Sequence, residues 1–230
     1  MGAQAELIVP YDPDERKKYE ERDGSSIFHQ NGYSVSLWHG IYKRGRFPEV
    51  AVRASLKALG FSVLISDPGM PTEGGYILTH YAGKRRRLDA AFQRMFQWFP
   101  EALITDLNRE CDDLKRSVSG NRGGGDPDLF VFSEAGDRFF VEVKDKDEIK
   151  EKQRATFASI ARILGCDVLM ARVKAESGAR PGDGLRLVSR PANTRLQPTA
   201  LDPIVKRRLK RHVSRTRPMQ GFTEILLQME

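Results

Sequence analysis

The chain has 230 residues, 40% of them hydrophobic and 30% charged, with a formal net charge of +7. This composition is typical of a folded protein and excludes wholesale disorder, and the length favours one core with additions. No apolar run approaches the roughly 18 residues that a membrane span needs, and the N-terminus lacks the basic-then-apolar pattern of a secretory signal. We therefore expect a cytoplasmic protein without a membrane partner.

The cysteines and the distribution of charge narrow the function classes further. Cys111 and Cys166 fall in different predicted elements, without the spacing of a zinc site or a disulfide framework, so we expect two small buried side chains. Between Leu201 and Arg217 there are seven Lys or Arg residues against one Asp. Such a run is typical either of a solvated helix face or of a surface that contacts phosphates.

The first third of the chain predicts an arm followed by a helix and a strand. Residues 1–47 contain a mixed-charge segment and then SVSLWHGIYKRGRF, which predicts a short hairpin, and we interpret them as an N-terminal arm. The aromatic and basic residues of that hairpin fit base stacking and an ordinary surface equally well. From Pro48, PEVAVRASLKALG predicts a helix that ends at Gly60, and FSVLIS predicts a strand.

Two helices are predicted next. RRLDAAFQRMFQWFP has apolar residues at three- and four-residue steps and predicts an amphipathic helix, and a second helix is predicted from about Glu101 to Lys115. We interpret residues 76–118 as a helical insertion, before the Gly-rich loop SGNRGGG.

The rest of the chain predicts a hairpin, a helix and a strand. Two apolar strands flank a polar turn between Gly123 and Asp147. KDEIKEKQRATFASIARILG then predicts a helix closed by Gly165, and DVLMARV predicts a strand that ends at Val173. From residue 174 the composition shifts to Gly, Pro, Ser and Arg, which we interpret as a basic C-terminal extension over 174–230.

Three charged residues interrupt the apolar strands of the hairpin: Asp128, Glu142 and Lys144. Successive strand residues point to opposite faces, so Glu142 and Lys144 share one face of FFVEVK. A turn near residues 135–136 sets Asp128 opposite Glu142 or Val143. Two carboxylates so close need a compensating cation, and oxygen ligands without His or Cys favour Mg²⁺ or Mn²⁺.

This arrangement predicts hydrolysis of phosphodiester bonds. The backbone carbonyl of Val143 completes the predicted ligands, and Lys144 would position the attacking water or neutralise developing charge. In the approach NRGGGDPD, small residues let a phosphate backbone come close. Taken alone, Glu142 with Lys144 could form an ordinary surface ion pair, and Pro127-Asp128 an ordinary turn. The predicted nucleic-acid-binding residues are Arg122, Lys206, Arg207, Arg208, Lys210 and Arg211.

The same residues resemble those of a known family. Gly125-Asp126-Pro127-Asp128 is similar to the G-x-P-D, and Glu142-Val143-Lys144 to the E-V-K, of the VRR-NUC branch of the PD-(D/E)xK nuclease superfamily. The resemblance covers roughly Gly123 to Val173. Its downstream motif D-x-L-S-x-x-Q resembles Asp147, Ile149 and Gln153, with Lys150 in place of the usual Ser.

The resemblance implies a fold: a restriction-endonuclease-like α/β core over 48–173, with a central mixed sheet flanked by helices. It also implies roles, with Asp128 and Glu142 as metal ligands and Lys144 as the catalytic lysine. Gln153 would face the site from the following helix. It also falls on the apolar stripe one turn after Ile149, where the alternative is a Gln at the solvent boundary.

The family also has an acidic residue on its first core helix. We assign this catalytic and metal-binding role to Glu49, because helix, Gly and strand follow it in the family's order. Glu110 is the alternative, and a simple helical pair of Glu49 with Arg53 is the structural explanation.

The resemblance therefore predicts a Mg²⁺-dependent nuclease that cleaves DNA, at junctions, flaps or ends, in repair, recombination, phage or restriction contexts. Its location would be cytoplasmic and nucleoid-associated. A homodimer and an activating partner protein stay open. Two alternatives remain: a nucleic-acid-binding protein without catalysis on the same fold, and a nuclease that acts on RNA.

Overall fold

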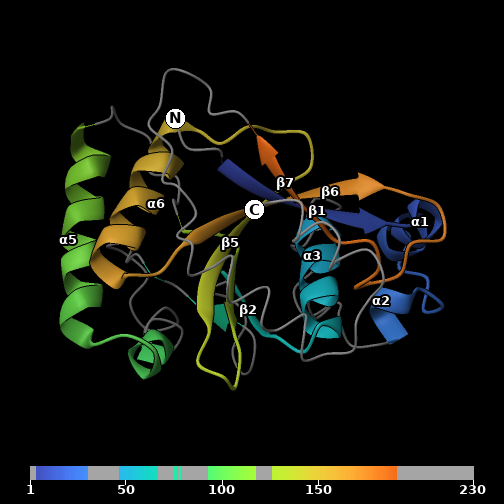
Figure 1. The fold of residues 1–230 in the computed structure, drawn as a ribbon, viewed down its shortest axis with the longest axis horizontal. Helices are drawn as coiled ribbons and strands as arrows, with labels where there is room; N and C mark the ends of the chain where they lie inside the picture. The colour runs from blue at the N-terminus through green and yellow to red at the C-terminus, as the bar shows by residue number, and fades with distance from the viewer. Residues whose placement is uncertain are drawn as a thin grey trace. The chain divides into compact units, whose positions relative to one another are not determined.

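The computed structural model (Figure 1) describes residues 4–30, 47–66, 75–76, 78, 93–117 and 126–190. Parallel and antiparallel strand pairs with flanking helices place the chain in the α/β class, and the expected restriction-endonuclease-like fold is confirmed. By its internal contacts the chain divides into two units. The second unit holds Val63–Glu142 and Asp147–Val168, and the first unit holds the rest, including Val143–Lys146.

The first unit is built around strand β1 (Gln4–Tyr11). It pairs in parallel with β6 (Val168–Ala175) and antiparallel with β7 (Arg186–Arg190). Helices α1 (Pro13–Glu20), α2 (Ile27–Gln30) and α3 (Phe47–Ala58) complete the unit. Asp12 caps α1 by accepting the Asp14 amide at 2.8 Å, as a short acidic side chain does at a helix start.

The N-terminal segment is where the sequence prediction of an arm is wrong. Leu7 and Val9 are buried, at 3% and 0% exposure, and Glu6 on the opposite face of β1 is buried as well, at 5%. A strand buried in this way lacks the polar and apolar alternation that identifies a half-exposed strand, so its pattern is weak. Residues 186–190, expected in the C-terminal extension, likewise form a paired strand. The hairpin predicted from SVSLWHGIYKRGRF lies outside the described residues, apart from Phe47.

The second unit contains the predicted hairpin. Its neighbouring strands are, in order, β3 (Gly75–Tyr76), β2 (Ser62–Ser66), β4 (Leu129–Phe132) and β5 (Arg138–Lys144), the last of which continues into the first unit. β2 and β3 run parallel, whereas β4 and β5 are antiparallel. The predicted helix at Pro48, the strand at FSVLIS and the hairpin are therefore confirmed in position.

Two helices lie side by side in the second unit, α5 (Glu101–Ser117) and α6 (Glu151–Leu164) (Figure 1). Their apolar faces share a core with the hairpin, in which the Phe130 and Phe140 rings lie 4.9 Å apart between centroids. Glu110 on α5 accepts hydrogen bonds from Ser159 and Arg162 on α6, so a polar contact reinforces this packing.

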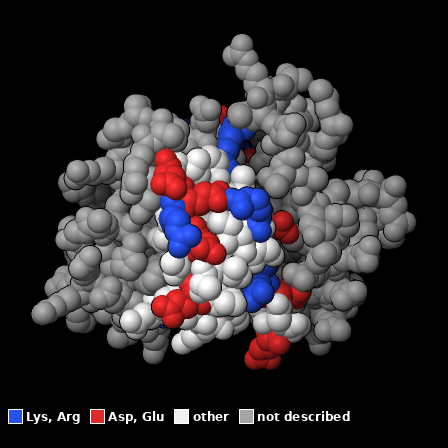
Figure 2. Space-filling model, turned by 90° about the vertical axis from the view of Figure 1, so that its left-hand side faces the viewer, with Lys and Arg blue, Asp and Glu red and all other residues white. Residues whose placement is uncertain are grey.

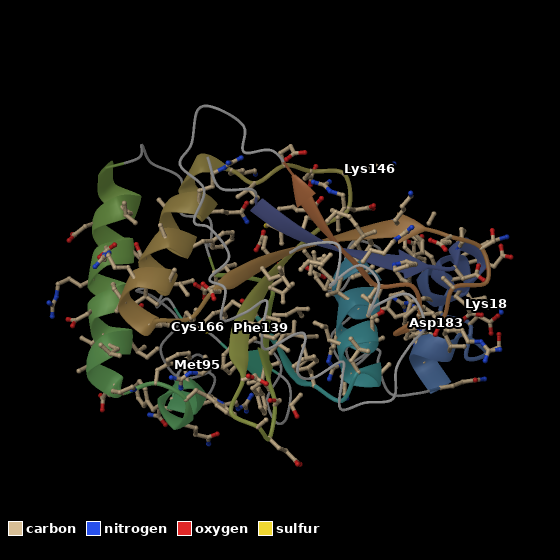
Figure 3. The ribbon with its side chains drawn as sticks, viewed as in Figure 1. Lys18, Met95, Phe139, Lys146, Cys166 and Asp183 are labelled. Atoms are coloured by element: carbon tan, nitrogen blue, oxygen red, sulfur yellow. The ribbon has the colours of Figure 1, made fainter. Side chains whose placement is uncertain are left out.

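Two predicted helices differ in the structure, whereas the prediction for the cysteines is confirmed. The helix expected from Lys146 begins only at Glu151. Of RRLDAAFQRMFQWFP, the described residues from 93 onward form a short 3-10 helix, η2 (Arg94–Gln97), and the earlier ones are not described. Both cysteines are free and buried, as expected. Figure 3 labels Cys166 together with Met95 and Phe139 of the same unit.

The face of the second unit that carries α5 is covered by charges of both signs. Figure 2 shows acidic and basic side chains interspersed there among the described residues. Arg109 and Asp106 form an ion pair at 3.2 Å on this helix. A mixed pattern of this kind lacks the single-sign field that attracts a polyanion. Within the described ranges, none of the helices combines the length and apolar character that a membrane crossing requires.

Candidate active site

The hairpin register brings the two predicted carboxylates to opposing positions. The paired residues run from Phe132 and Arg138 at the turn to Leu129 and Val141 at the open end. Asp128 precedes Leu129 and Glu142 follows Val141, so they are the next opposing pair. Of the two partners that the sequence left open for Asp128, the register therefore selects Glu142.

The turn that sets this register is closed by two backbone hydrogen bonds. Ser133 donates its amide to the Asp137 carbonyl at 2.9 Å, and Gly136 donates to the Ser133 carbonyl at 3.0 Å. Gly136 has φ of 85°, a left-handed conformation that glycine adopts without steric cost. β5 is also bonded on its other edge, where Phe140 donates its amide to the Asp167 carbonyl at 2.8 Å.

The two carboxylates extend the core face of the hairpin. Because strand residues alternate in direction, Glu142 shares the face of Phe140, and Asp128 at the open end of β4 is in register with Phe130. Both rings are fully buried in the core that includes residues of α6. Lys144, two residues after Glu142 on β5, is on the Glu142 face as well and is half-buried. Glu142 and Lys144 thus lie on one face of β5, as the sequence predicted.

Glu142 is buried and is held by Gln153. Only 1% of Glu142 is exposed. The Gln153 side chain donates from Nε2 to Glu142 Oε1 at 2.6 Å, and its own oxygen accepts the Lys150 amide at 3.2 Å. The amide group is neutral, so this hydrogen bond orients the carboxylate without cancelling its charge. A buried carboxylate of this kind is costly unless a cation or a proton compensates it.

The position of Gln153 explains why it reaches the strand. Lys150, in an extended conformation, caps α6, and Gln153 is the third residue of the helix. A side chain at that position can accept the amide of the capping residue, as in a capping box. Gln153 therefore faces the site, as its motif implied, although Ile149 precedes the helix and does not lie one turn before Gln153 within it.

The backbone around Asp128 is fixed from two sides. Its carbonyl accepts the Ser66 amide of β2 at 2.8 Å. Two residues earlier, Asp126 Oδ2 accepts the Leu78 amide at 3.0 Å, and the Leu78 carbonyl accepts from Asn108 of α5 at 2.8 Å. Sequence reasoning missed Asn108 and the role of Asp126, because contacts over 30 and 48 residues leave no local pattern.

The remaining predicted residues are placed as follows. Val143 is 7% exposed and, with Lys144, belongs by its contacts to the first unit. Glu49 lies in the first turn of α3, also in the first unit, and its catalytic role stays a prediction. The six predicted nucleic-acid-binding residues lie outside the described residues: Arg122, Lys206, Arg207, Arg208, Lys210 and Arg211.

Glu110, the alternative to Glu49, has a role in holding the helix pair. Hydrogen bonds from Arg162 and then Ser159 lower the pKa of Glu110, against the opposing effect of burial. The Glu110 carboxylate is therefore already paired with the guanidinium of Arg162 on α6.

The carboxylate donors of Asp128 and Glu142 fit a hard divalent cation, Mg²⁺ or Mn²⁺, better than zinc. Among the described residues, no group of three or more His, Cys, Asp and Glu could hold a metal ion. Zinc sites use such groups, with three or four side-chain ligands. Mg²⁺ instead uses one or two carboxylates together with water and substrate oxygens. Asp128 and Glu142 can supply the two carboxylates.

Comparison with known proteins identifies the domain. Residues 81–175 match the model of the VRR-NUC domain family. The matched range contains Asp128, Glu142, Lys144 and Gln153, and it excludes Glu49 and all of β1. Comparisons with curated proteins and with solved structures found no match. Residues 81–175 are therefore similar to the VRR-NUC domain, a nuclease domain family of the PD-(D/E)xK type, and the resemblance drawn from the motifs is confirmed for this part of the chain.

Proposed function

We propose that this chain is a Mg²⁺- or Mn²⁺-dependent nuclease that hydrolyses the phosphodiester bonds of DNA. The observation that carries the proposal is the carboxylate pair at the open end of the hairpin. Asp128 and Glu142 occupy opposing positions, and Glu142 is 1% exposed and held by the neutral amide of Gln153. A buried acid kept in this way is suited to a cation ligand.

The proposed roles of the site residues begin with the metal ligands. Asp128, Glu142 and the carbonyl of Val143 would hold the metal, which when bound supplies activation of water and stabilisation of charge on the phosphate. Gln153 keeps Glu142 in one orientation, since outer hydrogen bonds of this kind fix the direction of a ligand.

Lys144 is the proposed catalytic lysine. It follows Glu142 on the same face of β5, and its ammonium group carries three donors and a positive charge. Such a group can hold the attacking water and stabilise the charge that develops on the scissile phosphate. Glu49 on α3 stays the proposed acidic residue of the first core helix.

The proposed substrate is DNA with a junction, a flap or an end, encountered in the nucleoid during repair, recombination or restriction. Its backbone would be bound by the basic residues predicted from the sequence, since each neutralised phosphate adds affinity by counterion release. A homodimer would place two such sites on one substrate.

The test is cleavage of labelled single-stranded, duplex, flap and four-way-junction DNA with Mg²⁺ or Mn²⁺, by the wild type, Asp128→Ala and Asp137→Ala. Asp137 is the control, because it lies on the same hairpin but at the turn, where it contacts Ser133. We expect Asp128→Ala to lose on the order of 100-fold or more in rate, and Asp137→Ala to cleave like the wild type.

Other outcomes would redirect the proposal. Equal cleavage by Asp128→Ala would remove the hairpin from the chemistry. Salt-dependent DNA binding without cleavage by any of the three proteins would favour a binding protein on a nuclease fold. Faster cleavage of a matched RNA would make RNA the substrate.

A further inference from the structure

Asp145, which follows the proposed catalytic Lys144, accepts hydrogen bonds from two arginines. Asp145 Oδ2 accepts a hydrogen bond from Arg16 Nη1 on α1 at 3.2 Å. Its backbone carbonyl lies 3.4 Å from Arg172 Nη1 on β6. All of these residues, and Lys144 itself, belong to the first unit. Both the side chain and the backbone of Asp145 are therefore restrained.

Arg16 also contacts other residues of the first unit, which fix its side chain. Its Nε donates to Glu20 at 2.9 Å and its Nη1 to the Tyr11 hydroxyl at 3.0 Å, and its guanidinium carbon lies 5.3 Å from the centre of the Phe47 ring. Burial alone would lower the pKa of Arg16, but hydrogen bonds to Glu20, Tyr11 and Asp145 raise the pKa above its ordinary range. The group is a permanently charged and preorganised fork.

Arg172 is anchored by the N-terminal strand. Its Nε lies 2.9 Å from Glu6 Oε1 on β1, and the two side chains are only 17% and 6% exposed. A buried pair of this kind is sensitive to the loss of either partner, because the remaining charge is left without compensation. β1 and α1 thus reach Asp145 by two routes, through Arg172 and through Arg16.

We infer that the N-terminal segment β1–α1 supports the proposed catalytic lysine: Arg16 acts as a positioning residue that holds Asp145 and so fixes the adjacent Lys144. This inference rests on the proposed nuclease function and on Lys144 as its catalytic lysine. Lys144 is the last residue of β5, a place where a strand frays unless something ties it down. Glu6 and Arg16 lie outside the matched range 81–175, so the family domain alone does not supply this tie.

The chemistry explains why such a tie matters for the lysine in particular. A long side chain must be brought to the reacting phosphate from a fixed backbone, and a displacement of about 1 Å can lower a rate by up to about 100-fold. An Arg fork bound to a carboxylate fixes both distance and direction, whereas a Lys ammonium at position 16 would fix only a point charge.

The experiment compares Arg16→Ala with Lys18→Ala in the cleavage assay on full-length protein. Lys18 is the matched control, because it lies on the same helix and pairs only locally with Glu15 at 2.6 Å. Figure 3 labels it well apart from Lys146, the neighbour of Asp145. We expect Arg16→Ala to lower kcat on the order of 10-fold with little change in KM, and Lys18→Ala to match the wild type.

Two further variants separate positioning from a general loss of stability. Asp145→Ala should reduce kcat as Arg16→Ala does, and the double variant should be no slower than either single one, since both remove the same contact. Asp145→Asn keeps an acceptor of the same shape and should recover most of the rate. Hydrogen exchange of the amides 143–147 should accelerate in Arg16→Ala and not in Lys18→Ala.

The outcomes distinguish this inference from the function beneath it. If Lys144→Ala is inactive while Arg16→Ala retains wild-type kcat, the inference is overturned and the nuclease function stands. Additive losses in the double variant, or a loss confined to KM, would also overturn it. If the wild type cleaves no nucleic acid, the proposed function fails and the inference fails with it.

Discussion

Two carboxylates near the end of β5, Glu142 and Asp145, are held in opposite ways. Glu142 is 1% exposed and receives a hydrogen bond from the neutral amide of Gln153. The Asp145 side chain is 30% exposed and receives its hydrogen bond from the guanidinium of Arg16. In the first case the bond orients the acid and leaves its charge in place, and in the second the bond neutralises it. The charge of these hydrogen-bond donors therefore distinguishes the acid that we propose as a cation ligand from the acid that anchors the backbone.

The difference has an energetic basis. Burying an ionised carboxylate costs several kcal/mol, and a neutral hydrogen bond recovers about 1 kcal/mol of that. A metal ion would recover far more, and this is the role that we propose for a cation at Glu142. Asp145 is complete within the protein, and what it contributes is a fixed position.

The same chemical change at the two acids should lower the rate of cleavage to very different extents, and this is the largest effect that we expect. Glu142→Gln removes the charge and keeps the shape, so cleavage should fall on the order of 100-fold or more, while Asp145→Asn should cost only a few-fold. Single-turnover cleavage with saturating Mn²⁺ measures both. Thermal unfolding of Glu142→Gln should occur at or above the wild-type temperature, because a buried charge has been removed.

Equal losses at the two positions would break the comparison. So would a marked destabilisation of Glu142→Gln, since it would mean that the charge of Glu142 is satisfied within the fold.

Gln153→Ala should have the next largest effect. Without its amide, Glu142 loses its fixed orientation, and the affinity for the metal should fall by about 10- to 100-fold. Calorimetric titration with Mn²⁺ measures this directly, without reliance on cleavage. Gln153→Glu should be worse than Gln153→Ala, because a second carboxylate would face Glu142. An unchanged Mn²⁺ affinity in Gln153→Ala would remove Gln153 from the site.

Gly165→Ala provides the control for that experiment, at the opposite end of the same helix. Gly165 ends α6 with φ of 58°, and a Cβ there would meet nothing within 4 Å. Only backbone strain remains, which should cost about 1 kcal/mol of stability. Chemical denaturation measures this loss, and Mn²⁺ affinity should stay as in the wild type. A loss of affinity here would mean that Gln153 responds to the stability of the whole helix.

Glu110→Gln should have the smallest effect and concerns the helix pair rather than the site. The pKa of Glu110 lies below its ordinary value of 4.5, so its contacts with Arg162 and Ser159 stabilise the fold above about that pH and lose their effect as pH falls through the lowered pKa. At pH 7 the variant should lose at most about 1 kcal/mol, as is usual for a pair near the surface. The difference from the wild type should vanish in acid, as measured by denaturation at several pH values. A constant difference would contradict the lowered pKa.

Local patterns predicted the elements that carry the site. The hairpin, α3 and α5 follow from alternation, helical spacing and glycine stops, all of which act over a few residues. For the partner of Asp128 the sequence left Glu142 and Val143 open, and the observed register decides between them, because one register fixes every opposing pair.

Contacts between distant segments could not be predicted in this way. β1 was missed because both of its faces carry buried side chains and its residues do not alternate between polar and apolar. The hydrogen bond from Arg16 to Asp145 spans 129 residues. Asn108 and Asp126 both hydrogen-bond to the backbone of Leu78, a residue that has no motif of its own. Such links depend on tertiary structure, and a single sequence carries no local record of them.

The place of β1 between β6 and β7 also has a consequence for how the chain folds. Glu6 and Arg172, which join β1 to β6, are 166 residues apart in sequence. Closing so long a loop is entropically costly, and domains with such a high contact order fold slowly. During synthesis β1 would wait, unpaired and apolar, until nearly the whole nuclease domain had emerged from the ribosome.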